Sequence, residues 1–406
     1  MSPFWKLAFK NVFRNRRRTI ITMSIIVFGI VSLFFTYGFI DYSFHGLRES
    51  TIRQGVGHIQ VFHPEYNTKN EDRMLQYGIE NADSIAQLIN MDDDVRFAMK
   101  RIEFNGLISN GDKSEIFLGR GIEPKLEEKL SSVFVKMKEG KLLSQNSTGE
   151  FQIIIGYKLA EKLNAKIGDY LTMLSSTTYG AQNAIDVKLV GTFSMGVPQY
   201  DSRMIMVDLS AAQALIDTEK VTKLVVVLNE TEQSQEKLSA FKSLLPGYDL
   251  KDWEELATFY QSVVNLYSSA FGLLTVIIVF IVILAVVNTT VMSITERTKE
   301  IGTLLAIGTS QKQVLKNFVY ESIIIGVLGV SVALCVGLVL IGIVNMAEFM
   351  MPPPPGSTSG YPITIHIVPD MWLKISILTV VVSIVSSLTP AYKASKINIV
   401  DSLGHI

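Results

Sequence analysis

The sequence predicts an α-helical membrane protein with four transmembrane helices, both termini in the cytoplasm, and a large α+β domain outside the membrane between the first two helices. The 406 residues are 48% hydrophobic and only 18% charged, and the mean hydropathy is +0.31, which is too apolar for an ordinary soluble enzyme. Four long apolar runs and an uneven distribution of lysine and arginine support this fold class. The net charge of −1 gives no indication of a nucleic-acid partner.

The four apolar runs are long enough to cross a bilayer. A hydrocarbon core of ~30 Å requires roughly 20 apolar residues at about 1.5 Å per residue. The predicted spans are 19–40, 270–293, 322–345 and 371–388, of which the last is the shortest. Basic residues precede the first run, as in a secretory signal, but the run is long and no small-residue cleavage site follows it. We therefore expect four retained helices.

Basic residues determine the expected orientation. Residues 1–18 contain six lysines and arginines and no acid, whereas the connection 346–370 contains neither lysine nor arginine. The connection 294–321 and the tail 389–406 are again basic, with Arg297, Lys299, Lys312, Lys316, Lys393 and Lys396. Because basic loops stay on the cytoplasmic side, residues 41–268 and the loop 346–370 are predicted to lie outside.

Residues 41–268 have the composition of a folded α+β domain. Short β-branched runs bounded by Gly, Asp or Asn predict strands at "GHIQVF", "FQIIIG", "IDVKLVGTF", "RMIMVDL" and "KLVVVL". Between them, "NADSIAQLIN", "YKLAEKLN" and "LSAAQALID" predict helices. The only cysteine, Cys335, lies in an apolar run, so no intrachain disulfide can form.

Stalk helices are expected to join this domain to the spans. In "WEELATFYQSVVNLYSSAFG" apolar residues recur at nearly helical spacing without a proline, which predicts one helix from about Glu254 into the second span. The stalk positions are Phe259, Ser262, Val263 and Leu266. A weaker pattern, Phe44, Leu47 and Thr51, extends the first span, although Gly46 interrupts it. The alternative is that these are only the first and last helices of the domain.

The cytoplasmic connection 294–321 predicts a short charged helix. "ERTKEIGTLLAI" places Ile301, Leu304 and Leu305 on one face and gathers its charges in the first turns. Gly308, Thr309 and Ser310 form a corner that ends this helix, and Ser310 is suited to cap the next one. A helical hairpin lying on the bilayer would give a similar pattern.

Several motifs resemble the FtsX-like and MacB-like ABC transporter permeases. "ERTKEIGTLLAIG" followed by Glu321 is similar to a segment of that family in which E-R-x-x-E-I-G precedes A-x-G. "LAFKNVFRNRRRT" resembles the family's amphipathic N-terminal helix, and "IIIGYKLAEKLNAKIGDYLTM" and "LVGTFSMGVPQYDSRMIMVDLSAAQALI" resemble its outer domain, a MacB-like periplasmic core domain. "PAYKASKINIVDSL" resembles its C-terminal signature, with Ile399 where the family often has proline.

The resemblance implies a transporter permease and not an enzyme. Such permeases work as two permease subunits over two copies of an ATPase subunit, and the segment between the second and third spans is the coupling helix. The implied ATPase-coupling residues are Glu296, Arg297, Glu300, Ile301, Gly302, Ala306 and Gly308. No G-x-x-x-x-G-K-[ST] loop is present, so ATP and Mg would be bound by a separate ATPase chain, and this chain would hold no cofactor.

The partners implied are that ATPase, a second permease subunit, the lipid bilayer and, in one export route, a periplasmic adaptor or acceptor protein. A homodimer is favoured by small residues in the third span, Gly326, Gly329, Ser331 and Ala333, which permit close helix contact. A heterodimer with a paralogue is the alternative. The expected location is the bacterial inner membrane, with the large domain in the periplasm.

Three transport-related functions remain open. The "GVPQYD" turn and the separate ATPase look most like the Lol-type lipoprotein-releasing permeases; MacB-like efflux of peptides or small molecules and FtsX-like regulation of a cell-wall hydrolase are the alternatives. A secondary carrier is disfavoured because the span interiors carry no charge apart from Lys374 near an end.

Other chemistry has little support in the sequence. His58 and His63 would lie on opposite faces of a strand without a third ligand, so no metal site is expected. No G-x-S-x-G elbow is present. "MPPPPGSTSGYP", residues 351–362, predicts a polyproline II rod that is either a passive spacer or a gating surface.

Overall fold

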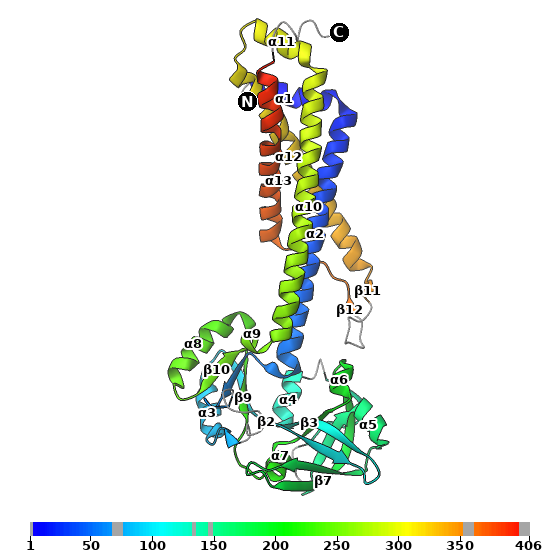
Figure 1. Cartoon of the computed structure of the whole chain (residues 1–406), viewed down its shortest axis with the longest axis vertical. Coiled ribbons are helices and arrows are strands. Elements are labelled where there is room, and N and C mark those ends of the chain that lie inside the picture. The colour runs from blue at the N-terminus through cyan, green and yellow to red at the C-terminus, as the bar shows by residue number, and fades with distance from the viewer. Residues whose placement is uncertain (1–2, 67–75, 132–134, 145–148, 352–360, 398–406) are drawn as a thin grey trace. The chain divides into compact units, whose positions relative to one another are not determined.

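The computed structural model describes residues 3–66, 76–131, 135–144, 149–351 and 361–397 (Figure 1). The chain divides into two units, which we describe separately. The helical unit comprises Met1–His45, Val264–Met350 and Pro362–Ile406, and the second unit comprises Gly46–Val263 and Met351–Tyr361.

Six helices make up most of the helical unit. They are α1 (Pro3–Arg14), α2 (Arg16–Thr51), α10 (Thr258–Glu296), α11 (Thr298–Ala306), α12 (Gln311–Met346) and α13 (Pro369–Ser395), of which α2 and α10 extend into the second unit. Within the described residues, α2, α10, α12 and α13 are long and apolar enough to cross a membrane. Each is longer than the span predicted for it, and α13 continues through Pro390.

The four long helices pack around aromatic and branched side chains. Phe34 of α2 stacks on Trp372 of α13 with ring centroids 4.3 Å apart, and Ile26, Ile30, Val286 and Ala333 fill the same core. The expected continuation of the first span is confirmed, because α2 runs to Thr51 through Gly46. A glycine in an exposed helix costs only about 1 kcal/mol, which the rest of a long helix easily offsets.

The small residues of the third span pack inside the chain, which corrects one argument for a homodimer. A Cβ on Gly329 would lie 2.8 Å from Cγ2 of Ile26, and one on Gly326 would lie 3.2 Å from Oγ of Ser383. Ala333 is fully buried, and only Ser331 is exposed. These residues let α2 and α13 approach α12, so they are no evidence for a contact between two chains.

A ten-stranded sheet forms the centre of the second unit, and its strand order is β10-β1-β9-β2-β3-β8-β5-β7-β4, with β6 pairing with β2 and β7. The strands are β1 (Ile59–Phe62), β2 (Val95–Ser109), β3 (Ser114–Ile122), β4 (Lys136–Gly140), β5 (Gln152–Gly156), β6 (Tyr170–Ser176), β7 (Gln182–Ser194), β8 (Met204–Asp208), β9 (Lys223–Leu228) and β10 (Asp249–Asp252). Among the strand pairs that the described residues of this sheet form, β3–β8 and β5–β7 are parallel and the others antiparallel. The α+β class and the five predicted strands are confirmed.

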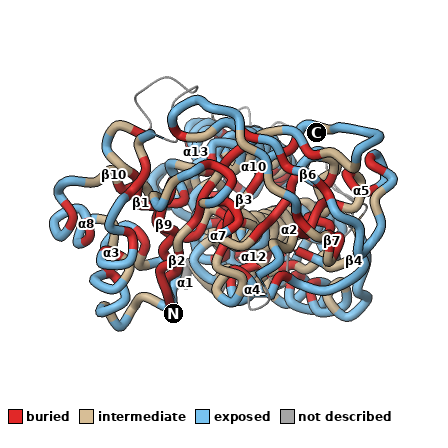
Figure 2. The backbone as a smooth tube through the Cα atoms, turned by 90° about the horizontal axis from the view of Figure 1, so that it is seen from below, coloured by how far each residue is buried: buried red, intermediate tan, exposed pale blue. Residues whose placement is uncertain are grey.

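Helices cover part of this sheet. They are α3 (Ala82–Ile89), α4 (Pro124–Ser131), α5 (Tyr157–Leu163), α6 (Pro198–Asp201), α7 (Leu209–Ile216), α8 (Ser234–Leu244) and α9 (Trp253–Leu256), with a π-helical turn η1 (Ile52–Val56) and a 3₁₀ turn η3 (Thr231–Gln233). The three predicted helices correspond to α3, α5 and α7. The main core includes Ile102, Phe117, Leu189 and Ile205, and Figure 2 shows β9 as buried.

The structure corrects one expectation about the connecting segments. The predicted helix from Glu254 is broken at Ala257, whose φ of −91° and ψ of 59° are not helical, so α9 ends and α10 begins at Thr258. The last part of the loop 346–370 is fixed to the helical unit, where Asn345 and Ile365 exchange two hydrogen bonds and His366 Nδ1 lies 2.9 Å from Asp41 Oδ2. Most of the predicted polyproline rod lies outside the described residues.

The packing of Gly329 generates a test of the helical unit. Replacing Gly329 by leucine should lower the thermal midpoint in detergent, because overpacking against Ile26 costs about 1–3 kcal/mol. Gly342 lies in the same helix, and a Cβ at this position would meet no atom within 4 Å, so Gly342→Leu is the matched control and should not destabilise. A Gly329→Leu protein that keeps its midpoint but loses self-association would show that this glycine faces a second chain.

Candidate functional site

Short helix α11 is delimited at both ends by specific backbone geometry. Helix α10 ends at Glu296, and Arg297, with φ −116° and ψ 16°, separates it from α11. At the other end Gly308 has a φ of +97°, and the N–H groups of Gly308 and Thr309 donate to the carbonyls of Leu305 and Leu304. This is the Schellman pattern, which a glycine at that position favours.

Ser310 then begins the next helix as predicted. Its backbone N–H donates to Gln313 Oε1 at 2.9 Å, as in a capping box. The expected corner and N-cap are therefore confirmed. The short helix is held in a defined position between two long ones.

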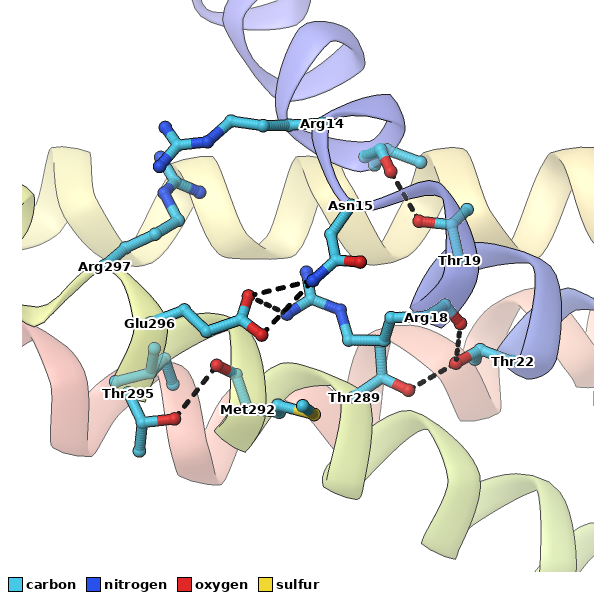
Figure 3. A network of polar contacts seen from close by, with 12 residues as sticks. Arg14, Asn15, Arg18, Thr19, Thr22, Thr289, Met292, Thr295, Glu296 and Arg297 are labelled. Atoms are coloured by element: carbon cyan, nitrogen blue, oxygen red, sulfur yellow. Dashed lines mark hydrogen bonds and ion pairs between the residues drawn. The ribbon is translucent and has the colours of Figure 1, made fainter.

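An ion-pair network joins the end of α10 and the start of α11 to the N-terminal helices. Arg14 Nη2 lies 2.6 Å from Glu300 Oε1 of α11. Arg18 Nη1 lies 2.9 Å from Oε2 of Glu296, the last residue of α10, and Figure 3 shows this pair. Asn15 Nδ2 also donates to Glu296, at 3.2 Å. The hydrogen bond from Arg14 lowers the pKa of the Glu300 carboxyl below its usual value, so Glu300 is charged.

The centre of the network is Arg297. Its Nη1 lies 2.8 Å from Glu321 Oε1 and its Nε lies 3.1 Å from Glu300 Oε2. Glu321 is buried in α12 and also accepts hydrogen bonds from Asn11, at 2.8 Å, and Asn317, at 3.2 Å. The three guanidinium groups of Arg14, Arg18 and Arg297 thus balance the three carboxylates of Glu296, Glu300 and Glu321.

The seven predicted coupling residues divide into three groups. Glu296, Arg297 and Glu300 are paired within the chain, and Ile301 and Gly302 are buried, Ile301 among Val314, Phe318, Ala391 and Ala394. Ala306 and Gly308 are exposed, together with Leu304 and with Ile307, which is 75% exposed. Glu296 and Glu300 are exposed as well, but both are paired with arginines of this chain. The exposed apolar residues of this segment therefore lie toward the C-terminal end of α11.

Sequence reasoning missed Ile307 and the partners supplied by α1 and α2. An exposed isoleucine between the helix end and a glycine corner was the available signal for Ile307. Nothing in the sequence paired Asn11, Arg14, Asn15 and Arg18 with residues almost 300 positions away.

A second group of paired polar residues lies where α2 ends in the second unit; we call η1 and its contacts the stalk root. The carbonyl of Gln54 accepts a hydrogen bond from Arg120 Nη1 at 3.1 Å, and that of Gly55 accepts one from Arg101 Nη1. Arg101 is fully buried, and its Nη2 lies 2.5 Å from Glu127 Oε2. Two cations at the carbonyl end of a helix compensate its unpaired carbonyl groups.

The start of α10 also packs on the stalk root. Ile52, Trp253 and Ala257 form a buried cluster, and the Trp253 ring contacts that of Tyr260 edge to face at 5.1 Å. Of the predicted stalk residues, Val263 is half-buried and Ser262 is exposed, while Phe259 and Leu266 are 73% and 68% exposed. This apolar face of α10 is therefore uncovered within the described chain.

His58 lies just before β1 and joins β9 to η3 and to the end of α2 through hydrogen bonds. Its Nδ1 accepts from the N–H of Leu228, so Nε2 carries the proton and lies 3.0 Å from Thr231 Oγ1, which in turn donates to Glu49. Burial lowers the pKa of His58 to about 4. Among the described residues, no group of three His, Cys, Asp or Glu side chains could hold a metal ion.

Comparison with known families gives two matches that together span most of the chain. Residues 19–244 match the family model of the MacB-like periplasmic core domain, and residues 272–399 match that of the FtsX-like permease C-terminal region.

Three individual relatives each share a quarter or less of the aligned residues with this chain. The lipoprotein-releasing system transmembrane protein LolC of Xylella fastidiosa is 25% identical over 328 residues, which covers 77% of this chain and 78% of that protein. An uncharacterized ABC transporter permease of Methanocaldococcus jannaschii is 23% identical, covering 98% of this chain and 96% of its own. The periplasmic region of MacB from Actinobacillus actinomycetemcomitans aligns with 52% of this chain and 95% of its own length, with a TM-score of 0.36 and 14% identity.

The buried pair of Arg297 and Glu321 generates one prediction. Arg297→Gln should lower the stability of the protein by about 3 kcal/mol, because it leaves the Glu321 carboxylate buried without a cation. The additional change Glu321→Gln should restore most of this loss. Arg14→Gln removes an exposed partner and should cost less than about 1 kcal/mol. Thermal unfolding in detergent compares these three variants with the parent, and equal losses for Arg297→Gln and Arg14→Gln would contradict this account.

The stalk root generates a pH prediction. The unfolded chain takes up a proton at His58 near pH 6.5 and the folded one only near pH 4, so stability should fall as the pH is lowered through this window, by at most about 1.4 kcal/mol per pH unit. His58→Asn should be less stable at pH 7 but show a flatter dependence on pH. Thermal midpoints of the two proteins between pH 7 and pH 5 test this, and identical slopes would exclude a neutral buried His58.

Proposed function

Because the chain belongs to the FtsX-like ABC transporter permeases with a MacB-like periplasmic core domain, we propose that ATP hydrolysis by a separate ATPase moves its outer domain and so extracts or exports cargo from the inner membrane. The observation that carries the proposal is helix α10. It runs unbroken from Thr258, next to the stalk root, to Glu296 in the ion-pair network. At about 1.5 Å per residue its 39 residues span roughly 58 Å, more than the ~30 Å hydrocarbon core.

We place both termini in the cytoplasm and the sheet domain in the periplasm. Two observations support this orientation. The basic residues flank α1, α11 and the end of α13, and the family model that matches residues 19–244 is a periplasmic domain. In this orientation α11 is exposed to the cytoplasm, where an ATPase is accessible.

The ATPase would dock on the C-terminal end of α11. Leu304, Ala306, Ile307 and Gly308 are exposed there, and apolar groups of this kind suit the core of a protein interface. Glu296, Arg297 and Glu300 act as positioning residues, because their charges are paired within the chain. Two ATPase copies, which bind the ATP and Mg, would serve two permease subunits, and a homodimer is the simpler assembly.

Lipoprotein release is the cargo reaction that we favour. It is supported by the LolC relative, which aligns over about three quarters of both chains. On this proposal the outer domain delivers lipidated protein to a periplasmic acceptor. MacB-like efflux through an adaptor and FtsX-like regulation of a hydrolase are the alternatives, and both use the same coupling through α10.

The continuity of α10 is the feature to test. In Ser262→Pro the ring removes one backbone hydrogen bond and clashes with the carbonyl of Thr258, which costs about 3 kcal/mol and bends the helix. We expect the complex with the ATPase and its ATP hydrolysis to remain, while release of a lipidated test protein from proteoliposomes is lost.

Two variants serve as controls. Ser262→Ala removes only the hydroxyl that donates to the Thr258 carbonyl, and the side chain is exposed, so release should be unchanged. Thr258→Pro places the ring at the first position of α10, where proline is tolerated, and should also release cargo. Normal release by Ser262→Pro would mean that α10 is only a tether.

A further inference from the structure

One face of helix α1 packs against α12, and another face carries exposed apolar side chains. Ala8, Asn11 and Val12 are buried toward α12, and Trp5 stacks on Tyr320 with ring centroids 4.8 Å apart. On the remaining face Phe9 and Phe13 are exposed and contact each other at 4.9 Å. Two exposed phenylalanines on a helix that already has a packing partner are typical of a helix lying in the interface of a membrane.

The first turns of α2 show where the surface of that membrane would be. Ile20 and Ile21 are each 61% exposed, and Arg16 and Arg17, one turn before them, are also exposed. Residues four apart lie on the same side of a helix, so Arg16 lies one turn before Ile20 on the same face, and Arg17 lies one turn before Ile21. An apolar stripe that ends in arginines matches the boundary between acyl chains and headgroups.

The charges on this face are not neutralised within the described protein. Arg14 and Arg18 pair with Glu300 and Glu296, but Lys10, Arg16 and Arg17 form no ion pair among the described residues. Residues 1–40 contain no acidic side chain at all. Three cations beside exposed aromatic and aliphatic residues are complementary to an anionic bilayer surface, for which each basic residue contributes roughly a fivefold gain in affinity.

We propose that Lys10, Arg16 and Arg17, with Phe9 and Phe13, form a binding surface for anionic phospholipid, and that lipid bound there holds α11 in position. The link to α11 is direct, because the same helix α1 carries Arg14, which binds Glu300, and Asn11, which binds Glu321. Lipid that fixes α1 therefore restricts the movement of α11. The proposal requires the chain to span a membrane and does not depend on the ATPase.

The test uses the full chain alone in nanodiscs of phosphatidylcholine, with or without phosphatidylglycerol. Spin labels are placed at the exposed positions Leu7 and Ala306 after Cys335 is replaced by alanine. We expect phosphatidylglycerol to narrow the distribution of distances between the two spin labels, one on α1 and one on α11. The triple variant Lys10→Gln, Arg16→Gln, Arg17→Gln should keep the broad distribution in both lipids and co-purify at least roughly fivefold less phosphatidylglycerol.

Two further triple variants are controls. One tests whether the response comes from these three residues or from positive charge in general, and the other tests whether the substitutions damage the fold. Lys299→Gln, Lys312→Gln, Lys316→Gln removes the same charge from exposed positions of α11 and α12 and should respond to phosphatidylglycerol like the parent. Lys10→Arg, Arg16→Lys, Arg17→Lys keeps the charge and should also respond.

Three results would overturn the proposal. The first is that the Lys299, Lys312 and Lys316 variant loses its response to phosphatidylglycerol as fully as the Lys10, Arg16 and Arg17 glutamine variant. This would indicate that positive charge anywhere on this side of the protein is sufficient. The second is narrowing by soluble glycerol phosphate in phosphatidylcholine nanodiscs, which would indicate a free phosphate site. The third is an unchanged response in the Lys10, Arg16 and Arg17 glutamine variant.

Discussion

A buried carboxylate in an apolar helix bundle must have a cation beside it, and in this protein that requirement places Arg297 next to Glu321. The arrangement of the neighbouring helices follows from this pair. Arg297 occupies the break between α10 and α11, so the break is fixed relative to α12. The same guanidinium group reaches Glu300, which Arg14 binds from α1. Arg297 thus connects the break before α11 with α12, and Glu300 connects α11 with α1.

The stalk root uses the same chemistry for a different purpose. There the buried cation is Arg101, its carboxylate is Glu127, and the third partner is the carbonyl of Gly55. Gly55 has a φ of +143°, and a Cβ at this position would lie 2.5 Å from the guanidinium of Arg120, so both the backbone and the neighbouring arginine require glycine. The end of α2 is thus joined to the sheet by groups that are costly to separate, because Arg101 and Glu127 would each remain charged and buried.

The sequence predicted the elements whose signal is local, and missed those decided by distant contacts. The long apolar helices, the corner at Gly308 and strands such as β5 and β9 have patterns that depend only on neighbouring residues. Strand β2 was missed because Lys100, Arg101 and Glu103 interrupt its apolar pattern, and Arg101 is compatible with a buried strand only because Glu127 lies opposite. The break at Ala257 has no glycine or proline to indicate it; it results from burial of Ala257 against Ile52 and Trp253. The ion pairs around α11 could not be predicted either, because the partners in α1 and α2 are distant in the sequence.

Pro390 lies inside α13, next to the residues of this helix that contact α11. The proline has no N–H, so the carbonyl of Ser386 loses its helical donor and the backbone there resists bending less than elsewhere in the helix. The residues just beyond it, Ala391 and Ala394, are the ones that pack against Ile301 of α11. A bend of α13 at this point would therefore displace Ala391 and Ala394 together and open their contact with Ile301, whereas Val314 and Phe318 of α12 would still hold that side chain. The contact between α11 and the last turns of α13 is thus one that α13 can release without any change before Pro390.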